Sequence, residues 1–284
     1  MTINIVCTSK PVDGLLYYSY EYNSYLNSCG IPSRLIIIPH RGFKKNDYLS
    51  AINNKYIHCK DVIIDSFTPL ENDVTLVMGR SMITISWLNF NDYSPSEQET
   101  LVSLFKCKLI SVYSENHPRD YPLALDFYSP NFVADLCDTE VYPSGIGTHF
   151  EETINFAIHK ECKIDKQVEY LFLGTNDKYY DAAVSVINNF PNYGILVYDA
   201  PYINKELNNM FAPVDNLLGI FDTYVYTKKT FDPAPRLFQE CKYHKKNIIY
   251  LRDKNIIDGG SVYWKRSLKD LNIKPIMEAY DKLH

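Results

Sequence analysis

Short apolar segments recur along the first half of the chain, and stretches with helical spacing lie between them. Continuous apolar runs bounded by polar residues are typical of parallel strands that are buried on both faces. Strands that alternate with helices predict an open parallel sheet covered by helices on both faces. The apolar segments are INIVCTS (3–9), RLIIIPH (34–40), CKDVIID (59–65), VTLVMG (74–79) and CKLISVYS (107–114).

Two of the intervening stretches have clear helical signals. In residues 15–30 apolar side chains recur on one helical face, and Gly30 ends the pattern as a C′ glycine does. In residues 94–106 an N-cap is provided by Ser94 or Ser96, and acidic residues occupy the first turn. We therefore expect a helix in each stretch.

The alternation breaks at residues 137–167, where Pro143, Gly145 and Gly147 lie close together. Such a cluster with mixed charge is typical of a linker between domains. The alternation then restarts, with strands expected at 168–176, 193–199, 222–227 and 246–251 and a helix at 177–190.

These patterns predict an α/β fold with two Rossmann-like domains facing across a cleft, with ligands at the carboxyl ends of the strands. We expect a first α/β domain at 1–142, a linker at 143–167 and a second α/β domain at 168–262. A C-terminal helix is expected at 263–284, and a return of this helix to the first domain is one arrangement for it.

Composition is that of an ordinary globular protein, with 46% hydrophobic and 22% charged residues among 284. No apolar run approaches the roughly 20 residues that span a bilayer. The seven cysteines are scattered and never have C-x-x-C spacing, which favours reduced thiols over a disulfide scaffold or zinc site. We expect a cytoplasmic protein with no membrane span, and nothing here indicates its oligomeric state.

Charge is unevenly distributed along the chain. The net charge is −5, but residues 241–284 contain 10 Lys and Arg against 5 Asp and Glu, a local +5 that leaves −5 − 5 = −10 for the rest. A basic C-terminal region is compatible with a phosphate-bearing partner, whereas a solvated lysine-rich face is the commoner cause of such a bias. The negative total argues against indiscriminate binding of polyanions.

Several familiar chemistries lack their motifs. The sequence contains no G-x-G-x-x-G, G-x-x-x-x-G-K-[ST], H-E-x-x-H or G-x-S-x-G pattern, and no two aspartates are separated by a single residue. Without a D-x-D pair, a metal-assisted nucleotide-sugar enzyme is disfavoured, and we expect neither a metal nor a resident cofactor.

Two strand exits in the second half carry candidate ligand-binding residues. At the first, Gly174 and Thr175 begin a turn into a helix whose first turn contains Lys178, so the exposed N–H groups and the lysine suit a phosphate. An ordinary N-cap with one exposed lysine is the alternative. At the second, Thr227 and Lys228 follow a predicted strand.

A short helix after this second exit carries Arg236 and Glu240, four residues apart and therefore on one face. Such a pair is usually a surface salt bridge worth about 0.2–0.5 kcal/mol. At a strand exit, however, Arg236 suits bidentate contact with a diphosphate, and Glu240 suits hydrogen bonds from two ribose hydroxyls.

These segments resemble the two-domain nucleotide-sugar glycosyltransferases of the GT-B fold. YLFLGTNDK (170–178) and the stretch 222–260 resemble the donor-binding segments of that family, and VYPSGIGTHFEE (141–152) resembles its crossing between domains. The resemblance implies that Gly174, Thr175, Lys178, Thr227, Lys228, Arg236, Glu240 and Gly259 bind the donor, a nucleoside diphosphate sugar for which UDP is favoured. ISVYSENHP (110–118) resembles the strand whose final histidine faces the donor sugar, which implies a catalytic role for His117.

On the acceptor side, Asp13 ends the first loop, where it is either the base that takes the acceptor proton or an exposed turn residue. The alternative for His117 is a plain loop histidine, and for Gly259 a tight turn. The family's glycine-rich loop after the first strand is represented only by KPVDGLLYY (10–18), a departure that bears on the acceptor site.

The sequence also resembles compact glycosyltransferases of large tailed phages, notably at SENHPRDYPLA (114–124) and YPSGIGTHFEE (142–152). That resemblance implies hydroxymethylated pyrimidine in DNA as one acceptor class, and the host cytoplasm as the location. Three alternatives stay open: a transferase directed at a glycan or small molecule, a sugar-nucleotide epimerase, and a non-catalytic module that binds a nucleotide or partner.

Overall fold

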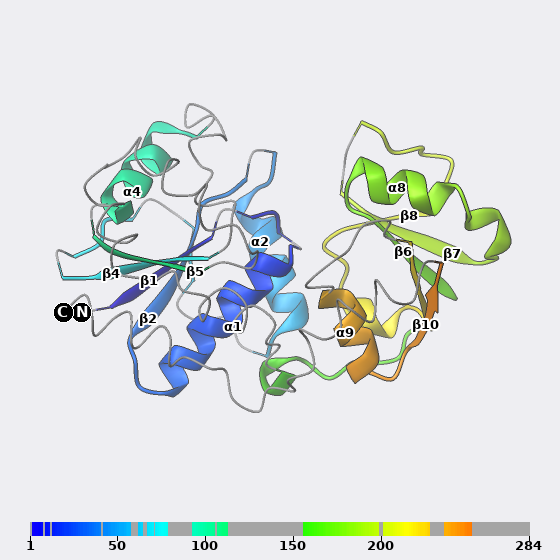
Figure 1. Ribbon diagram of the computed structural model, residues 1–284, viewed down its shortest axis with the longest axis horizontal. Helices are drawn as coiled ribbons and strands as arrows, with labels where there is room; N and C mark the ends of the chain where they lie inside the picture. Colours follow the sequence, from blue (N-terminus) through cyan, green and yellow to red (C-terminus); the bar gives the residue numbers. More distant parts are fainter. Residues whose placement is uncertain are drawn as a thin grey trace. The chain divides into compact units, whose positions relative to one another are not determined.

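The computed structural model describes residues 2–7, 9–11, 13–40, 42–57, 62–64, 67–70, 72–78, 93–105, 107–112, 156–198, 201–227 and 236–251 (Figure 1). The chain forms two units. The first consists of Met1–Ile52, His58–Ile158 and Arg266–His284, and the second of Asn53–Ile57 and His159–Lys265. In the described part, no helix is long and apolar enough to cross a membrane.

The first unit contains a five-stranded parallel sheet in the order β3-β2-β1-β4-β5. In Figure 1, α1 and α2 lie on one side of this sheet and α4 on the other. Its strands are β1 (Ile3–Cys7), β2 (Ser33–Ile37), β3 (Val62–Ile63), β4 (Val74–Met78) and β5 (Lys108–Val112), and its helices are α1 (Gly14–Ser28), α2 (Lys45–Lys55) and α4 (Pro95–Phe105).

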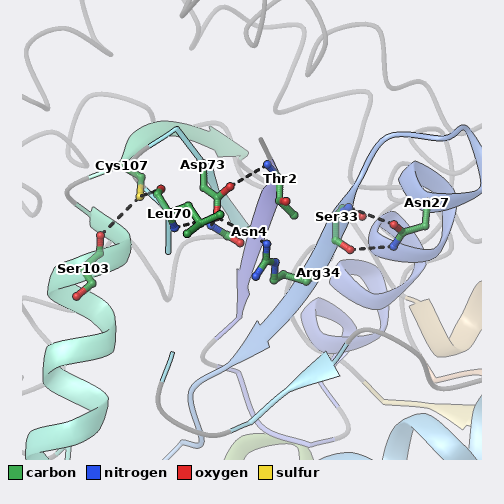
Figure 2. A network of polar contacts seen from close by, with 9 residues as sticks. All are labelled: Thr2, Asn4, Asn27, Ser33, Arg34, Leu70, Asp73, Ser103 and Cys107. Atoms are coloured by element: carbon green, nitrogen blue, oxygen red, sulfur yellow. Dashed lines mark hydrogen bonds and ion pairs between the residues drawn. The ribbon is translucent and has the colours of Figure 1, made fainter. Parts of the chain in front are cut away.

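A buried carboxylate organises the amino edge of this sheet (Figure 2). Asp73, which is 1% exposed, accepts hydrogen bonds from the backbone N–H of Thr2 at 2.9 Å and of Leu70 at 3.1 Å. Arg34 lies 3.7 Å from the same carboxylate. Burying a charge is costly unless donors surround it, so this group ties the start of β1, the start of β4 and β2 to one another.

The second unit contains a parallel sheet in the order β10-β9-β6-β7-β8. Counted within each unit, both sheets therefore have the order 3-2-1-4-5 of a doubly wound fold. The strands are β6 (Tyr170–Gly174), β7 (Tyr193–Val197), β8 (Asn209–Phe211), β9 (Thr223–Tyr226) and β10 (Asn247–Tyr250), the helices α8 (Asp177–Val184) and α9 (Arg236–Tyr243), and the 3₁₀ turns η4 (Phe156–Ile158), η5 (Ile187–Asn189) and η6 (Leu217–Gly219).

Side chains of this second sheet alternate between two cores. Phe172 of β6 and Val225 of β9 pack in one core with Tyr180 of α8. Their strand neighbours Leu171, Tyr224 and Tyr226 pack in the other with Phe238 of α9, and the rings of Tyr226 and Phe238 meet edge to face at 6.0 Å. Helices thus cover both faces, and the prediction of two Rossmann-like α/β domains is confirmed.

The predicted helices at 15–30 and 94–106 are confirmed as α1 and α4. Gly30 adopts φ +78 after α1, and Ser94 forms a capping box, since its N–H donates to Glu97 at 2.7 Å. Helix α2 lies in a stretch for which no helix was predicted. Its last residue, Lys55, and the following Tyr56 belong to the second unit.

Candidate functional site

The second sheet has a topological switch point between β6 and β9. From β6 the chain continues to β7 and β8 on one side, then to β9 and β10 on the other. The two strands are paired, with Phe172 opposite Val225. Gly174 ends β6 and Thr227 directly follows β9, so these predicted donor-binding residues end neighbouring strands at the edge where such folds bind ligands.

At the β6–α8 turn the backbone donors are already engaged. The side chain of Asn176 caps α8 by accepting from the N–H of Tyr179 at 3.0 Å. The N–H of Lys178 donates to Asp177 at 2.9 Å, and the Lys178 side chain is exposed. The ordinary N-cap that the sequence left open is therefore present, and a phosphate would compete with two side-chain acceptors for these N–H groups.

Packing explains why residue 174 is glycine. A Cβ at Gly174 would lie 2.7 Å from Cγ2 of Ile195, 2.9 Å from Cδ2 of Tyr180 and 3.0 Å from Cγ1 of Val197. Glycine therefore allows β6, β7 and α8 to approach closely, which is a different reason from the approach of a ligand. The contact of Gly174 with a donor stays a prediction.

The loop after β7 adds aromatic side chains to this edge. The hydroxyl of Tyr180 accepts from the N–H of Asn204 at 2.9 Å, which anchors the loop to α8. Tyr202 from the loop packs beside Tyr180 with ring centroids 5.7 Å apart, and its hydroxyl lies 3.5 Å from the carbonyl of Gly174. Burial raises the pKa of Tyr202, so its hydroxyl is a neutral donor. No local pattern in the sequence marked Tyr202.

The strongest cluster lies on α9, where the structure brings Arg236 and Glu240 together. The guanidinium Nε donates to Oε1 of Glu240 at 2.7 Å, and the side chains are 9% and 3% exposed. The i,i+4 spacing did indicate a pair on one face, with a surface salt bridge as the common outcome. The pair is instead buried, where partner geometry matters far more than at a surface.

Lys55 is a third member of this cluster, and the sequence did not mark it. Its Nζ donates to the same Oε1 of Glu240 at 2.5 Å, from a side chain that is 17% exposed. The next residue, Tyr56, places its hydroxyl 3.5 Å from Nη2 of Arg236. Among the described residues, no hydrogen bond or ion pair reaches the other oxygen of Glu240, Oε2.

The charges around Glu240 decide its protonation. Burial by itself raises the pKa of this carboxyl, but the positive charges of Lys55 and Arg236, together with the nearby His159, outweigh burial and lower it below its ordinary value. Glu240 is therefore an ionised carboxylate at neutral pH, held at one oxygen by two cations.

In the first unit, Asp13 caps α1. Its Oδ1 accepts from the N–H of Leu15 at 3.0 Å, and the residue is exposed. Desolvation by the surrounding protein nevertheless raises the pKa of the carboxyl, against the lowering effects of the Leu15 N–H and of the charges of Lys10 and His40. Asp13 thus has a structural role as a cap and retains one oxygen, Oδ2, beyond this cap bond.

A buried phenol joins the two loops at the carboxyl ends of β1 and β2. Tyr48 of α2 donates to the carbonyl of Ser9 at 2.9 Å and accepts from the N–H of His40 at 2.7 Å. Beneath them, burial raises the pKa of Cys7 to about 11, so its thiol stays protonated beside Ser9. The start of the loop that ends in Asp13 is therefore held in place by the hydrogen bond from Tyr48 to Ser9.

Three predicted residues, His117, Lys228 and Gly259, lie outside the described residues. Of the others, Arg236 and Glu240 form one cluster, and Gly174, Thr175 and Thr227 lie at neighbouring strand ends. Lys178 is exposed in the first turn of α8, and Asp13 belongs to the first unit. No group of three His, Cys, Asp or Glu side chains suited to a metal ion occurs within the described ranges.

No protein-family model matches the chain, and no curated protein matches it. Among solved structures, UDP-GlcNAc 2-epimerase from Neisseria meningitidis bound to UDP-GlcNAc matches with 10% identity and a TM-score of 0.39, over 100% of this chain and 91% of that one. The glycotransferase of kitacinnamycin matches with 11% identity and a TM-score of 0.33, over 99% and 90%. UDP-GlcNAc 2-epimerase from Methanocaldococcus jannaschii matches with 10% identity and 0.33, over 99% and 92%. The fold assignment rests on the strand order of the two sheets.

Proposed function

We propose that the protein is a glycosyltransferase that moves a sugar from a nucleoside diphosphate sugar to an acceptor hydroxyl, with the donor bound by the second unit. The observation that carries this proposal is the state of Glu240. Its carboxylate is buried and ionised, two cations converge on Oε1, and Oε2 has no hydrogen-bond partner among the described residues.

This arrangement suits a ribose. In the described part of the chain, Oε2 is not among the fully buried side-chain atoms that lack a partner, so it is open to hydrogen-bond donors from outside the chain. A pair of adjacent hydroxyls supplies two donors to one carboxylate, and acidic residues bind ribose in this way in other Rossmann-like folds. Helix α9 begins after the carboxyl end of β9, and in this proposal Arg236 in its first turn would contact the diphosphate attached to that ribose.

The remaining predicted residues take roles around the same ligand. Gly174, Thr175 and Thr227 would border the diphosphate at the switch point, with Lys178, Lys228 and Arg236 opposing the charge that grows on the leaving oxygen. Gly259 would approach the donor sugar, and His117 would shape its pocket. No step of this scheme needs a metal ion.

In the reaction, the acceptor oxygen forms a bond to the anomeric carbon as the bond from that carbon to the diphosphate breaks. Asp13 would take the acceptor proton through the oxygen that is not used in the helix cap. A carboxylate that accepts a proton in this way acts as a general base.

The finer form of the proposal has UDP as the nucleotide and hydroxymethylated pyrimidine in DNA as the acceptor. Support for a phosphate-bearing acceptor comes from charge: residues 241–284 contain 10 Lys and Arg against 5 Asp and Glu. The nucleotide is tested by binding and the acceptor by the transfer reaction itself.

The first test is a thermal-shift panel of UDP, GDP and ADP with the full chain. Binding at a ligand concentration of 100 times Kd stabilises the folded state by about 2.7 kcal/mol. Failure of all three nucleotides to raise Tm would overturn the proposal in favour of a protein that binds a different partner. Loss of the shift in Arg236→Ala and Glu240→Ala is expected, and a shift that survives in both would move the donor site elsewhere.

The second test follows the sugar. The matching nucleotide sugar is incubated with hydroxymethylated DNA, with an oligosaccharide, and with no acceptor, and products are weighed by mass spectrometry. Added sugar mass on DNA supports the finer proposal, whereas added mass on the glycan alone rejects the DNA acceptor. Isomerised donor formed without an acceptor would identify an epimerase instead.

A further inference from the structure

Building on the proposed function, we propose that Lys55 is a positioning residue of the donor site. By fixing Oε1 of Glu240 together with Arg236, it holds Oε2 toward the ribose hydroxyls and makes the site selective for ribonucleoside over 2′-deoxyribonucleoside diphosphates. Lys55 does not touch the nucleotide in this scheme and acts through Glu240.

The geometry of the contact supports an orienting role. Lys55 Nζ and Arg236 Nε lie 2.5 and 2.7 Å from the same oxygen of Glu240. They come from different elements, the end of α2 and the start of α9. A carboxylate held at one oxygen by two donors cannot rotate out of plane without lengthening both bonds, so the position of its second oxygen is determined as well.

The ammonium of Lys55 is not what attaches its segment to the second unit. The carbonyl of Lys55 accepts from the N–H of Lys160 at 2.9 Å, and Tyr56 forms a β-bridge with His159. The Tyr56 side chain is 1% exposed and meets the ring of His159 edge to face at 5.1 Å. The backbone and a buried ring therefore anchor this segment, so the contact of the Lys55 ammonium with Glu240 is additional to that anchor.

The positive charge of the Lys55 ammonium also affects the protonation of Glu240. Lys55 contributes the largest of the attractive charges that lower the pKa of Glu240 against the opposing effect of burial. An ionised carboxylate accepts hydrogen bonds from both hydroxyls of a ribose, whereas a protonated one must donate at one oxygen. A 2′-deoxyribose has lost one of the two donors, so an ionised and oriented Glu240 distinguishes the two sugars.

The test compares affinities for UDP and 2′-deoxy-UDP by calorimetry in the full chain, and uses the ADP and GDP pairs in the same way. A hydrogen bond to a charged group corresponds to on the order of 10- to 100-fold in affinity, and we expect a ribo-to-deoxy preference of this size in the wild type. Lys55→Met and Glu240→Gln should both reduce this preference to about threefold or less. Lys55→Arg, which keeps a cationic donor, should restore most of it.

Lys160→Met is the matched control, because this exposed lysine lies on the adjoining strand segment and its side chain has no place in the cluster. It should leave the preference unchanged. Lys55→Gln provides a variant with a neutral donor of similar reach, in case Lys55→Met does not fold.

The outcomes separate this inference from the proposal on which it rests. If Lys55→Met weakens the binding of UDP and of 2′-deoxy-UDP by the same factor, the positioning role is overturned, while the donor-binding proposal is unaffected. If Glu240→Gln keeps the preference for UDP over 2′-deoxy-UDP, the carboxylate does not contact the ribose, and the inference is overturned as well. Absence of binding by every ribonucleotide to the wild type would instead reject the proposed function.

Discussion

Replacing Gly174 by alanine tests the packing at the end of β6. The added methyl would meet Ile195 at 2.7 Å, Val197 at 3.0 Å and the ring of Tyr180 at 2.9 Å. The first two are β-branched strand residues with stiff side chains, and Tyr180 is tethered through its hydroxyl to Asn204. None of the three moves at low cost.

Overpacking a core by one methyl costs about 1–3 kcal/mol. Alanine also reduces the entropy of the unfolded chain, which returns about 0.4–1 kcal/mol. Taking the midpoints of these two ranges, the net expectation for Gly174→Ala is a loss of about 1.3 kcal/mol in the free energy of unfolding. At about 2–4 °C per kcal/mol for chains of this general size, Tm should fall by about 3–5 °C.

Gly194→Ala in β7 is the matched control for this experiment. Its methyl would also collide, at 2.6 Å, but with the Sδ atom near the end of the flexible Met210 side chain, which can move aside. In scanning fluorimetry, the Tm of Gly194→Ala should lie close to that of the wild type, and both should lie well above the Tm of Gly174→Ala. A Gly174→Ala protein as stable as the wild type, or more stable than Gly194→Ala, would refute the packing explanation.

Three further predictions follow from the polar groups. The carboxylate of Glu240 has a pKa lowered by Lys55, Arg236 and His159, so its contribution to stability is present above the unfolded value of about 4.5 and is lost as pH falls through the folded pKa. The difference in unfolding free energy between wild type and Glu240→Gln, measured by urea denaturation, should therefore shrink as the pH falls below 4.5, and a difference that stays constant there would contradict the lowered pKa. Asp13→Ala should lose about 1 kcal/mol of stability together with the helix cap, whereas Asp13→Asn should keep the cap. Loss of sugar transfer in both variants would support the role of Asp13 as the base, and full transfer by Asp13→Asn would exclude that role. Asp73→Ala removes the acceptor of two partly buried backbone N–H groups, those of Thr2 and Leu70, and should cost about 1–3 kcal/mol by denaturant titration. A neutral result would show that these N–H groups find other acceptors.

The strands could be predicted because their signal is local. A run such as VTLVM or YLFLG is almost continuously apolar, and both became interior strands, β4 and β6. Helix α2 has a weaker signal, since Tyr48, Ala51 and Ile52 are the buried side chains among its eleven residues. Spacing of three and four residues was present there, but surrounding asparagines and lysines diluted it.

The candidate site could be predicted only where its members are close in sequence. The four-residue spacing of Arg236 and Glu240 placed them on one helical face, as observed. Whether that face is solvated or buried depends on Lys55 and Tyr56, which are 185 and 180 residues away from their contacts. No periodicity connects positions so distant, so neither the burial of the pair nor its third member was predictable.

The five residues Asn53–Ile57 have a practical consequence because they belong to the second unit while the chain on both sides of them belongs to the first. The second unit is therefore not a portable module. A fragment that starts at residue 143 would lack Tyr56 and Lys55, exposing one side of α9 and removing one of the two cations that contact Glu240. Chimaeras made by exchanging halves at that position would mismatch this cluster unless residues 53–57, at and beyond the end of α2, are exchanged together with the C-terminal half.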